Sequence, residues 1–240
     1  MAAVKKNAQL LSGIRIYAVG DVHGRVDLLD RTMSQIDEHL VSSPVARPIE
    51  VYLGDYIDRG PASREVLDRL VSRRRTHATV CLMGNHEIFM LEFLKRPEIL
   101  NEWQSYGGLA TLASYGLEPI MNATEAQQAK LATALQHTLP NSHHLFLKNL
   151  ALSFTCGDFF FVHAGVRPGV PLKTQSQDDL LWIREDFLLH EESFGKIVVH
   201  GHTPVLQPEI RPNRINIDTG AYATGRLTCL ILEGQTVTFL

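Results

Sequence analysis

The chain has 240 residues, 45% of them hydrophobic, and a formal net charge of −3 at pH 7. This length suits one larger α/β or β-sandwich domain with a sizeable core. The slightly acidic balance argues against a nucleic-acid partner, because proteins that bind nucleic acid usually present a basic surface to its phosphates.

The three cysteines, at positions 81, 156 and 229, lie far apart and form no Cys-x-x-Cys motif. Their odd number and wide spacing favour free thiols in a reducing compartment. The N-terminal stretch MAAVKKNAQLLSG lacks the apolar run of a signal peptide, and no segment approaches the ~18 apolar residues of a membrane span. We therefore expect a cytoplasmic protein that does not act at a membrane.

The first part of the chain alternates between strand and helix patterns. Short, β-branched runs predict strands at 14–19, 49–53 and 78–83. Apolar residues at helical spacing predict three helices, at 26–40, from Ser63 (taken as the N-cap), and at 86–95 before Pro97. This alternation indicates βαβ units with parallel strands, whose functional side chains lie in the loops after the strands.

Residues 97–149 have a mostly helical pattern, which includes a capping box at Thr124 and Gln127. We interpret the segment as a helical insertion near the active site, within a single domain that spans residues 1–240. No role is assigned to its individual residues.

After this segment the apolar period changes to two, with a hairpin turn at Gly157 and Asp158. Further strands are expected at 196–202, 214–220, 226–234 and 235–240. A parallel half followed by a more antiparallel half predicts a mixed α/β fold, with two packed β-sheets flanked by helices.

Potential metal ligands stand directly after the predicted strands. A lone residue of this kind is usually a turn, a helix cap or a partly buried side chain. Here the arrangement recurs at five strand ends, which favours a common metal centre. Mixed carboxylate, amide and imidazole donors suit Mn, Fe or Zn. The candidates are Asp21 and His23 in GDVHG, Asp55 in GDY, Asn85 in GNHE, His163 in VHAG and His202 in HGHTP.

The series GDVHG, GDYIDRG, GNHE, HAG and GHTP, between residue 14 and about residue 230, resembles that of the phosphoprotein phosphatases within the metallophosphoesterases. The compact bacterial and phage-type serine/threonine protein phosphatases, which share WIR and IDTGA, are especially similar. The resemblance implies a calcineurin-like two-sheet fold. It also implies two divalent metal ions per chain, with Mn the first choice and Fe or Zn as alternatives.

The resemblance further implies how the candidate ligands are shared between the ions. Asp21 and His23 would hold one ion and Asp55 would bridge both. His200 lies next to the site, and the sequence leaves open whether it also contacts a metal. The ligands implied for the second ion are Asn85, His163 and His202.

Four other residues are expected to act on the substrate. His86 resembles the general acid that protonates the departing alkoxide, and Asp58 would fix its tautomer. Arg59 and Arg184 would bind phosphate oxygens, since guanidinium groups match phosphate geometry. In this mechanism a hydroxide held by both metal ions attacks phosphorus directly. Glu87 is expected to support the loop.

The sequence leaves the roles of some residues open. Tyr56 and Tyr222 would either flank the substrate or belong to the core. The arginines that could substitute for Arg59 or Arg184 are Arg25, Arg167 and Arg226.

The predicted function is hydrolysis of phosphate monoesters, in phosphorylated proteins or small phosphoesters. A diadenosine tetraphosphatase-like hydrolase is the alternative, although symmetrical enzymes of that kind tend to lack the aspartate found here at position 58. A non-catalytic interaction module would have lost ligands or the acid. A nucleic-acid phosphodiesterase is disfavoured by the net charge. The oligomeric state does not follow from the sequence.

Overall fold

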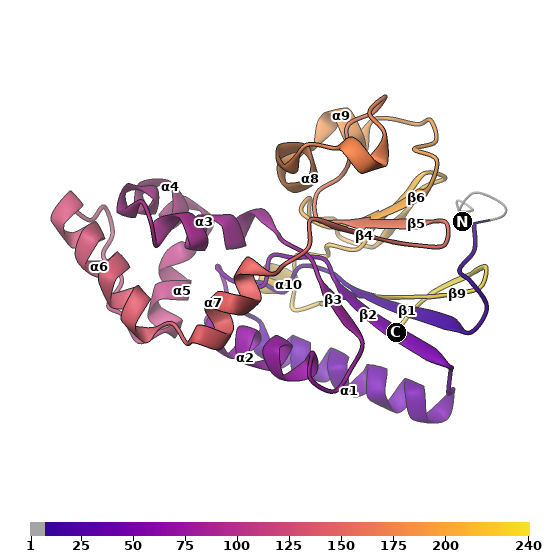
Figure 1. Ribbon diagram of the computed structural model, residues 1–240, viewed down its shortest axis with the longest axis horizontal. Helices are drawn as coiled ribbons and strands as arrows, with labels where there is room; N and C mark the ends of the chain where they lie inside the picture. Colours follow the sequence, from indigo (N-terminus) through magenta and orange to yellow (C-terminus); the bar gives the residue numbers. More distant parts are fainter. Residues whose placement is uncertain (1–7) are drawn as a thin grey trace.

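The structure is a computed structural model in which residues 8–240 are described. Residues 1–7 begin the stretch assessed for a signal peptide and lie outside the described part. Two five-stranded sheets pack against each other, with helices on their outer faces (Figure 1). The predicted mixed α/β fold of two sheets flanked by helices is confirmed.

The first sheet has the order β10-β9-β1-β2-β3. Its three N-terminal strands are parallel, as the βαβ pattern predicts, while β9 and β10 are antiparallel to their neighbours. The strands are β1 (Ile14–Val19), β2 (Arg47–Tyr52), β3 (Thr79–Cys81), β9 (Cys229–Glu233) and β10 (Thr236–Phe239).

The second sheet has the order β4-β5-β6-β8-β7, with β5, β6 and β8 parallel. The second half of the chain is still the more antiparallel one, as expected, because β4 and β5, β7 and β8, β9 and β10, and β1 and β9 all pair antiparallel. The parallel direction of β5, β6 and β8 did not follow from the sequence. A period of two is the same for both strand directions, and the connections after β5 and β6 cross over rather than form hairpins. The strands are β4 (Ser153–Cys156), β5 (Phe159–Val162), β6 (Ile197–His200), β7 (Glu209–Ile210) and β8 (Arg214–Asn216).

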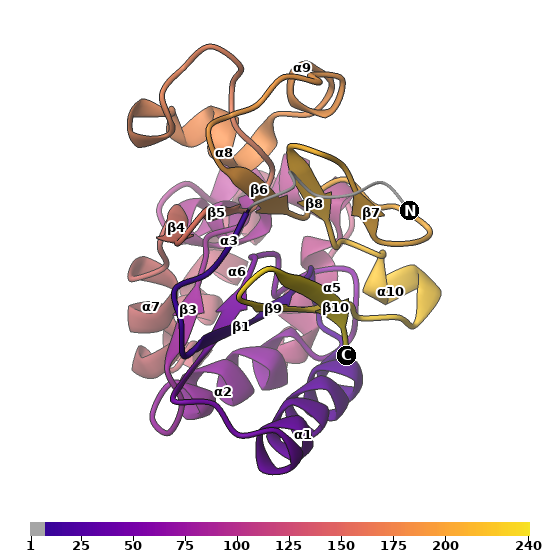
Figure 2. The same ribbon diagram turned by 90° about the vertical axis from the view of Figure 1, so that its right-hand side faces the viewer.

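Alternate residues of each strand face opposite layers, as the pleat requires. Ile16 of β1 and Phe161 of β5 both lie in the apolar core between the sheets. Tyr17 of β1 packs on the outer face of the first sheet, and Phe160 of β5 on that of the second. The sandwich therefore has three apolar layers, one between the sheets and one under the helices of each outer face. Figure 2 shows the two sheets with α1 and α2 outside the first and α8 and α9 outside the second.

Helices cover both outer faces. α1 (Val26–Ser42) and α2 (Ser63–Arg73) pack on the first sheet, and α8 (Gln177–Trp182) and α9 (Glu185–Leu188) pack on the second. The remaining short elements are η3 (Leu172–Thr174) and α10 (Ala221–Thr224). No helix among residues 8–240 has the length and apolar character needed to cross a membrane.

The segment 97–149 is helical, as expected, and extends beyond the end of the sandwich with α3 (Figure 1). Its predicted capping box is confirmed, since Gln127 Oε1 accepts from the Thr124 N–H at 2.8 Å. The elements are α3 (Asn85–Phe93), η1 (Pro97–Ile99), α4 (Leu100–Trp103), η2 (Gln104–Tyr106), α5 (Gly108–Ser114), α6 (Glu125–Thr138) and α7 (Asn141–Lys148).

Backbone hydrogen bonds join the two ends of this excursion. The Met83 N–H donates to the Ala151 carbonyl at 2.8 Å, and the Ala151 N–H donates to the Cys81 carbonyl at 3.1 Å. The end of β3 in the first sheet is thereby linked to the start of the second sheet.

The N-terminus of α2 differs from the expectation. Ala62 is the N-cap, and Ser63 is the first helical residue and makes no capping hydrogen bond. Its hydroxyl instead accepts from the Asp58 N–H at 3.0 Å. The prediction of Ser63 as N-cap is wrong because the preceding loop uses that hydroxyl.

Two arginines of α2 pair with aspartates of α1 in contrasting surroundings. Arg73 is buried and donates to Asp37 and to the buried Glu50, both at 2.6 Å. Arg69 donates to Asp30 at 2.8 Å, and both of those side chains are about half exposed. Comparison of these two ion pairs therefore separates the effect of burial on stability from the effect of charge.

We expect Arg73→Met to lower the free energy of unfolding by about 3–5 kcal/mol, because Glu50 loses its cationic partner while remaining buried. The matched change Arg69→Met should cost less than about 1 kcal/mol, since water screens that pair. Chemical denaturation of both variants measures the difference. Equal small losses would contradict the structural importance of the buried pair.

Candidate metal centre and active site

The carboxyl ends of strands from both sheets meet at one place, which the βαβ reading predicts. β1, β2 and β3 contribute residues from the first sheet, and β5 and β6 contribute residues from the second. All the candidate ligands are at most 6% exposed. They are Asp21 and His23 after β1, Asp55 after β2, Asn85 after β3, His163 after β5 and His202 after β6.

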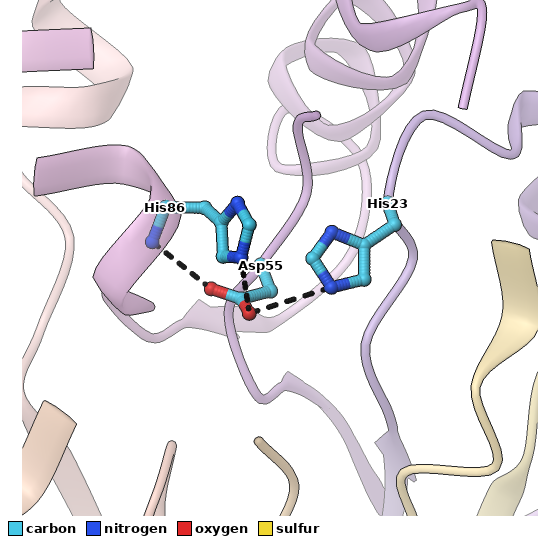
Figure 3. Close-up of side chains that lie close together, drawn as sticks. All are labelled: His23, Asp55 and His86. Carbon is cyan, nitrogen blue, oxygen red and sulfur yellow. Dashed lines mark hydrogen bonds and ion pairs between the residues drawn. The ribbon is translucent and has the colours of Figure 1, made fainter. Parts of the chain in front are cut away.

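A first group of possible ligands comprises His23, Asp55 and His86. Figure 3 shows the two imidazoles beside the Asp55 carboxylate. Oδ2 of Asp55 lies 3.5 Å from His23 Nε2 and 3.7 Å from His86 Nε2. The two rings meet edge to face, with centroids 4.6 Å apart.

A second group comprises Asp55, His163 and His202, with Asn85 beside them. Asn85 Oδ1 lies 3.0 Å from both His163 Nε2 and His202 Nδ1. His163 Nε2 is also 3.4 Å from Oδ1 of Asp55. Two ligands that hold one ion at about 2.1 Å lie about 3.0–3.4 Å apart, and these spacings match.

Asp55 belongs to both groups, and its two oxygens face different ones. Oδ2 faces His23 and Oδ1 faces His163. This geometry suits a carboxylate shared by two cations, which is the arrangement that the motif resemblance implies.

The histidine tautomers suit metal binding. His23 Nδ1 donates to the Ile57 carbonyl at 2.9 Å, and His163 Nδ1 donates to the Leu53 carbonyl at 3.0 Å. Each ring therefore directs the Nε2 lone pair at Asp55. Burial lowers the pKa of His23 to about 3 and that of His202 to about 2, which keeps these imidazoles in the neutral form that binds metal.

Asp21 lies outside both compact groups, although its surroundings also suit a cation. Its Oδ2 accepts from the His202 N–H at 3.0 Å. Within residues 8–240, buried Asp21 Oδ1 and His202 Nε2 have no hydrogen-bond partner. Burial and the carboxylates of Asp218 and Asp55 raise the pKa of Asp21 well above its usual value. A divalent cation would supply the missing contact of Asp21 Oδ1 and the missing positive charge, so these residues fit metal ions.

Two of the motif glycines allow close packing between motifs. A Cβ at Gly84 would collide with Oδ1 of Asp55, and a Cβ at Gly201 would collide with Oδ1 of Asp21. The glycine of one motif thus makes room for the carboxylate of another.

The backbone is left-handed at several of the same loops. His23, Asp55 and His202 have φ values of 46°, 51° and 65°. Residues other than glycine rarely adopt this region, and such positions concentrate at functional sites. Surrounding hydrogen bonds must therefore hold these loops.

Glu87 provides such support for the Asp55 loop. The fully buried carboxylate accepts backbone N–H groups of Asp55 at 2.9 Å, Tyr56 at 2.8 Å and Gly84 at 2.9 Å. The expectation that Glu87 supports the loop is confirmed.

His86 and Asp58 form a buried pair. His86 Nδ1 lies 2.7 Å from Asp58 Oδ2, and neither residue is more than 2% exposed. Burial lowers the pKa of His86, but the carboxylates of Asp55 and Asp58 outweigh burial and raise the pKa to about 8.

Arg59 and Arg184 are exposed at the edge of the metal groups. Arg59 Nη1 donates to the Tyr222 hydroxyl at 2.6 Å, and its guanidinium lies 4.6 Å from the centre of that ring. Arg184 Nη1 donates to Thr203 Oγ1 at 3.2 Å, next to His202. Each guanidinium group therefore contacts a residue that lies next to a candidate ligand, Tyr222 beside His23 and Thr203 beside His202.

The other arginines considered as substitutes have different contacts. Arg25 pairs with Asp27, Arg167 pairs with Asp179 and Asp186, and Arg226 donates to the Leu206 carbonyl and the Gln207 side chain.

His200 and the two tyrosines also have distinct environments. His200 packs edge-on against Phe187 of α9, with ring centroids 4.9 Å apart, so its ring lies in the outer layer of the second sheet. Tyr56 is fully buried and donates to the Leu82 carbonyl at 2.7 Å, which is a core role. Tyr222 lies beside His23 as well as Arg59.

Trp103 and Thr111 contact the Asp58 carboxylate from the segment 97–149, and neither role follows from the sequence. The glycines at positions 107 and 108 in WQSYGG indicate close packing of this stretch, but they do not identify the Asp58 loop as its partner.

Comparison with known proteins agrees with this geometry. A bis(5'-nucleosyl)-tetraphosphatase PrpE [asymmetrical] of Anoxybacillus flavithermus is 27% identical, over 88% of each chain. Serine/threonine-protein phosphatase 2 of Escherichia coli is also 27% identical, over 89% of this chain and 90% of the other. The solved structure of a candidate diadenosine tetraphosphatase has a TM-score of 0.64 at 18% identity, and covers 100% of this chain and 96% of the other.

The solved structure supports the likeness of the fold alone. The family match covers residues 14–228, which contain the whole motif series. It confirms the resemblance seen in the sequence, and the chain belongs to the calcineurin-like phosphoesterases, the metallophosphoesterase enzymes.

Proposed function

We propose that the chain hydrolyses phosphate monoesters in a metal-dependent reaction, with phosphoserine and phosphothreonine of proteins as the substrate class. The buried hydrogen bond between His86 Nδ1 and Asp58 carries this proposal. It leaves His86 Nε2 near the shared carboxylate, 3.7 Å from Asp55 Oδ2. A serine or threonine alkoxide leaves poorly unless a proton is supplied, and Nε2 is placed to supply one.

The proposed ligands of one ion are His23 and Asp55 of the first group, with Asp21 in place of His86. The other ion takes the second group together with Asn85, and Asp55 is common to both. When bound, two divalent cations would lower the pKa of a water from ~15.7 towards ~7 and offset the charge of the phosphoryl oxygens. We assign Mn to these positions, with Fe or Zn as alternatives. The ligands are Asp21, His23 and Asp55 for one ion, and Asp55, Asn85, His163 and His202 for the other.

The remaining residues act on the ester. Arg59 and Arg184 bind phosphoryl oxygens through their guanidinium forks and orient the phosphorus. Water oxygen forms the new bond to phosphorus while the bond to the ester oxygen breaks. His86 Nε2 donates its proton to that ester oxygen, and Asp58 holds the ring in the required orientation.

A second candidate function is hydrolysis of dinucleoside polyphosphates. The printed activity of the Anoxybacillus flavithermus relative supports it. The same arginines can bind an anhydride phosphate. Cleavage there releases a phosphate group, which depends less on a general acid than an alkoxide does.

Replacement of the proposed acid tests its role. We expect His86→Asn to lower kcat on a phosphothreonine peptide by ~10²-fold or more, because the alkoxide loses its proton donor. Metal content, measured by mass spectrometry, should stay near two ions per chain. His137→Asn, on the exposed face of α6, is the control and should retain normal kcat. Full activity of His86→Asn would remove His86 from the mechanism.

Asp55→Asn tests the shared ligand. This change keeps the side-chain shape but removes the negative charge, so bound metal should fall to one ion or fewer per chain. Asp27→Asn, which affects an exposed carboxylate, should leave metal content unchanged. Chelation should abolish wild-type activity, and Mn is the first ion to test for recovery. Two tightly held ions in Asp55→Asn would contradict the assignment.

A substrate panel separates the two candidate functions. The metal-loaded protein is compared on phosphoserine, phosphothreonine and phosphotyrosine peptides, diadenosine tetraphosphate and single-stranded DNA. We expect the highest kcat/KM on the phosphoserine or phosphothreonine peptide. A higher value on diadenosine tetraphosphate would establish the second candidate instead, and cleavage of DNA alone would contradict both.

A further inference from the structure

The carboxylate of Asp58 receives donors from the helical segment as well as from His86. Trp103 Nε1, at the end of α4, donates to Oδ2 at 2.7 Å, so that this oxygen is shared with His86 Nδ1. Thr111 Oγ1, in α5, donates to Oδ1 at 2.5 Å. Asp58, Trp103 and Thr111 are all fully buried. Each carboxylate oxygen is therefore fixed by a side chain of the helical segment.

Thr111 also holds the backbone of Asp58, together with Ser63 of α2. The Asp58 φ of 71° is left-handed, and its N–H points at the hydroxyls of Thr111, at 2.9 Å, and Ser63, at 3.0 Å. Thr111 thus contacts both the main chain and the carboxylate of one residue. Rotation of the Asp58 carboxylate would break the contacts of both its oxygens.

The stretch between Trp103 and Thr111 also packs directly on the loop that carries Asp58 and Arg59. The Arg59 N–H donates to the Gly107 carbonyl at 3.3 Å. A Cβ at Gly107 would lie 2.7 Å from Arg59 N, and a Cβ at Gly108 would collide with the Trp103 indole. Both glycines of WQSYGG are thus needed for this close approach, which brings α4 and α5 onto the loop of Asp58 and Arg59.

We infer that Trp103 and Thr111 are positioning residues for the hydrolytic reaction. They fix both oxygens of Asp58, so that Oδ2 holds the His86 ring with Nε2 directed at the metal groups. The inference rests on the proposed role of His86 as general acid. It gives the segment 97–149 a part in the reaction as well as in covering the site.

Buried polar groups are usually hydrogen-bonded for stability alone, so the test needs a readout that stability does not change. Phenyl phosphate and p-nitrophenyl phosphate have nearly the same shape, but phenolate requires protonation on leaving far more than nitrophenolate does. Misplacement of the acid therefore slows the hydrolysis of phenyl phosphate more than that of p-nitrophenyl phosphate. A general loss of structure slows both substrates equally.

The matched variants are Thr111→Val, which removes the hydroxyl, and Thr111→Ser, which keeps it. With Thr111→Val we expect kcat on phenyl phosphate to fall by ~10-fold or more, which is part of the full effect of a general acid. The kcat on p-nitrophenyl phosphate should change by less than ~3-fold. Thr111→Ser should restore the wild-type ratio of the two rates. Trp103→Phe, which removes the Nε1 donor, should resemble Thr111→Val.

His86→Asn is measured alongside on both substrates. Selective loss in His86→Asn but equal losses in Thr111→Val would overturn the positioning role and leave the proposed acid intact. Absence of selectivity in His86→Asn itself would overturn the acid and the inference together. In the double variant His86→Asn, Thr111→Val, no further selective loss is expected, because the two residues act through one proton transfer. Additive selective losses would contradict that coupling.

Discussion

The carboxylate of Asp55 lies where loops of the two sheets meet, and the rest of the site depends on its position. One oxygen faces His23 from the first sheet, and the other faces His163 from the second. Packing of the sheets through their shared apolar core therefore sets the distance between the two halves of the centre. Burial makes this arrangement costly without positive charge, because carboxylates removed from water require compensating partners.

Local backbone strain accompanies this arrangement. His23, Asp55, Asp58, Arg59 and His202 all have positive φ, and each such residue costs on the order of 1–3 kcal/mol. The cost is offset by buried hydrogen bonds to rigid elements. Glu87 of α3 holds the Asp55 loop, and the hydroxyls of Ser63 and Thr111 hold the backbone of Asp58. Stability and function are therefore coupled through the same few contacts.

Much of this organisation follows from the sequence, since repeated strand–glycine–ligand patterns predict both the parallel strands and the convergence of their ends. Three features did not follow. The period of two does not report strand direction, so the sequence did not show that β5, β6 and β8 run parallel within a mostly antiparallel second half. Ser63 has the composition of a helix cap, but a tertiary contact uses its hydroxyl. The sequence around Trp103 carries no signal for a polar contact, and only the fold shows that its indole N–H donates to Asp58.

The hydrogen bonds between residues 81–83 and Ala151 close the intervening excursion into a loop with joined ends. Because the entropic cost of closing a loop grows only slowly with its length, this excursion can gain or lose residues while both sheets keep their registers. Variation there is limited by the contacts near the Asp58 loop and by the packing of Phe146 of α7 against Tyr56. The architecture thus permits diversification of the surface beside a reaction centre that stays unchanged.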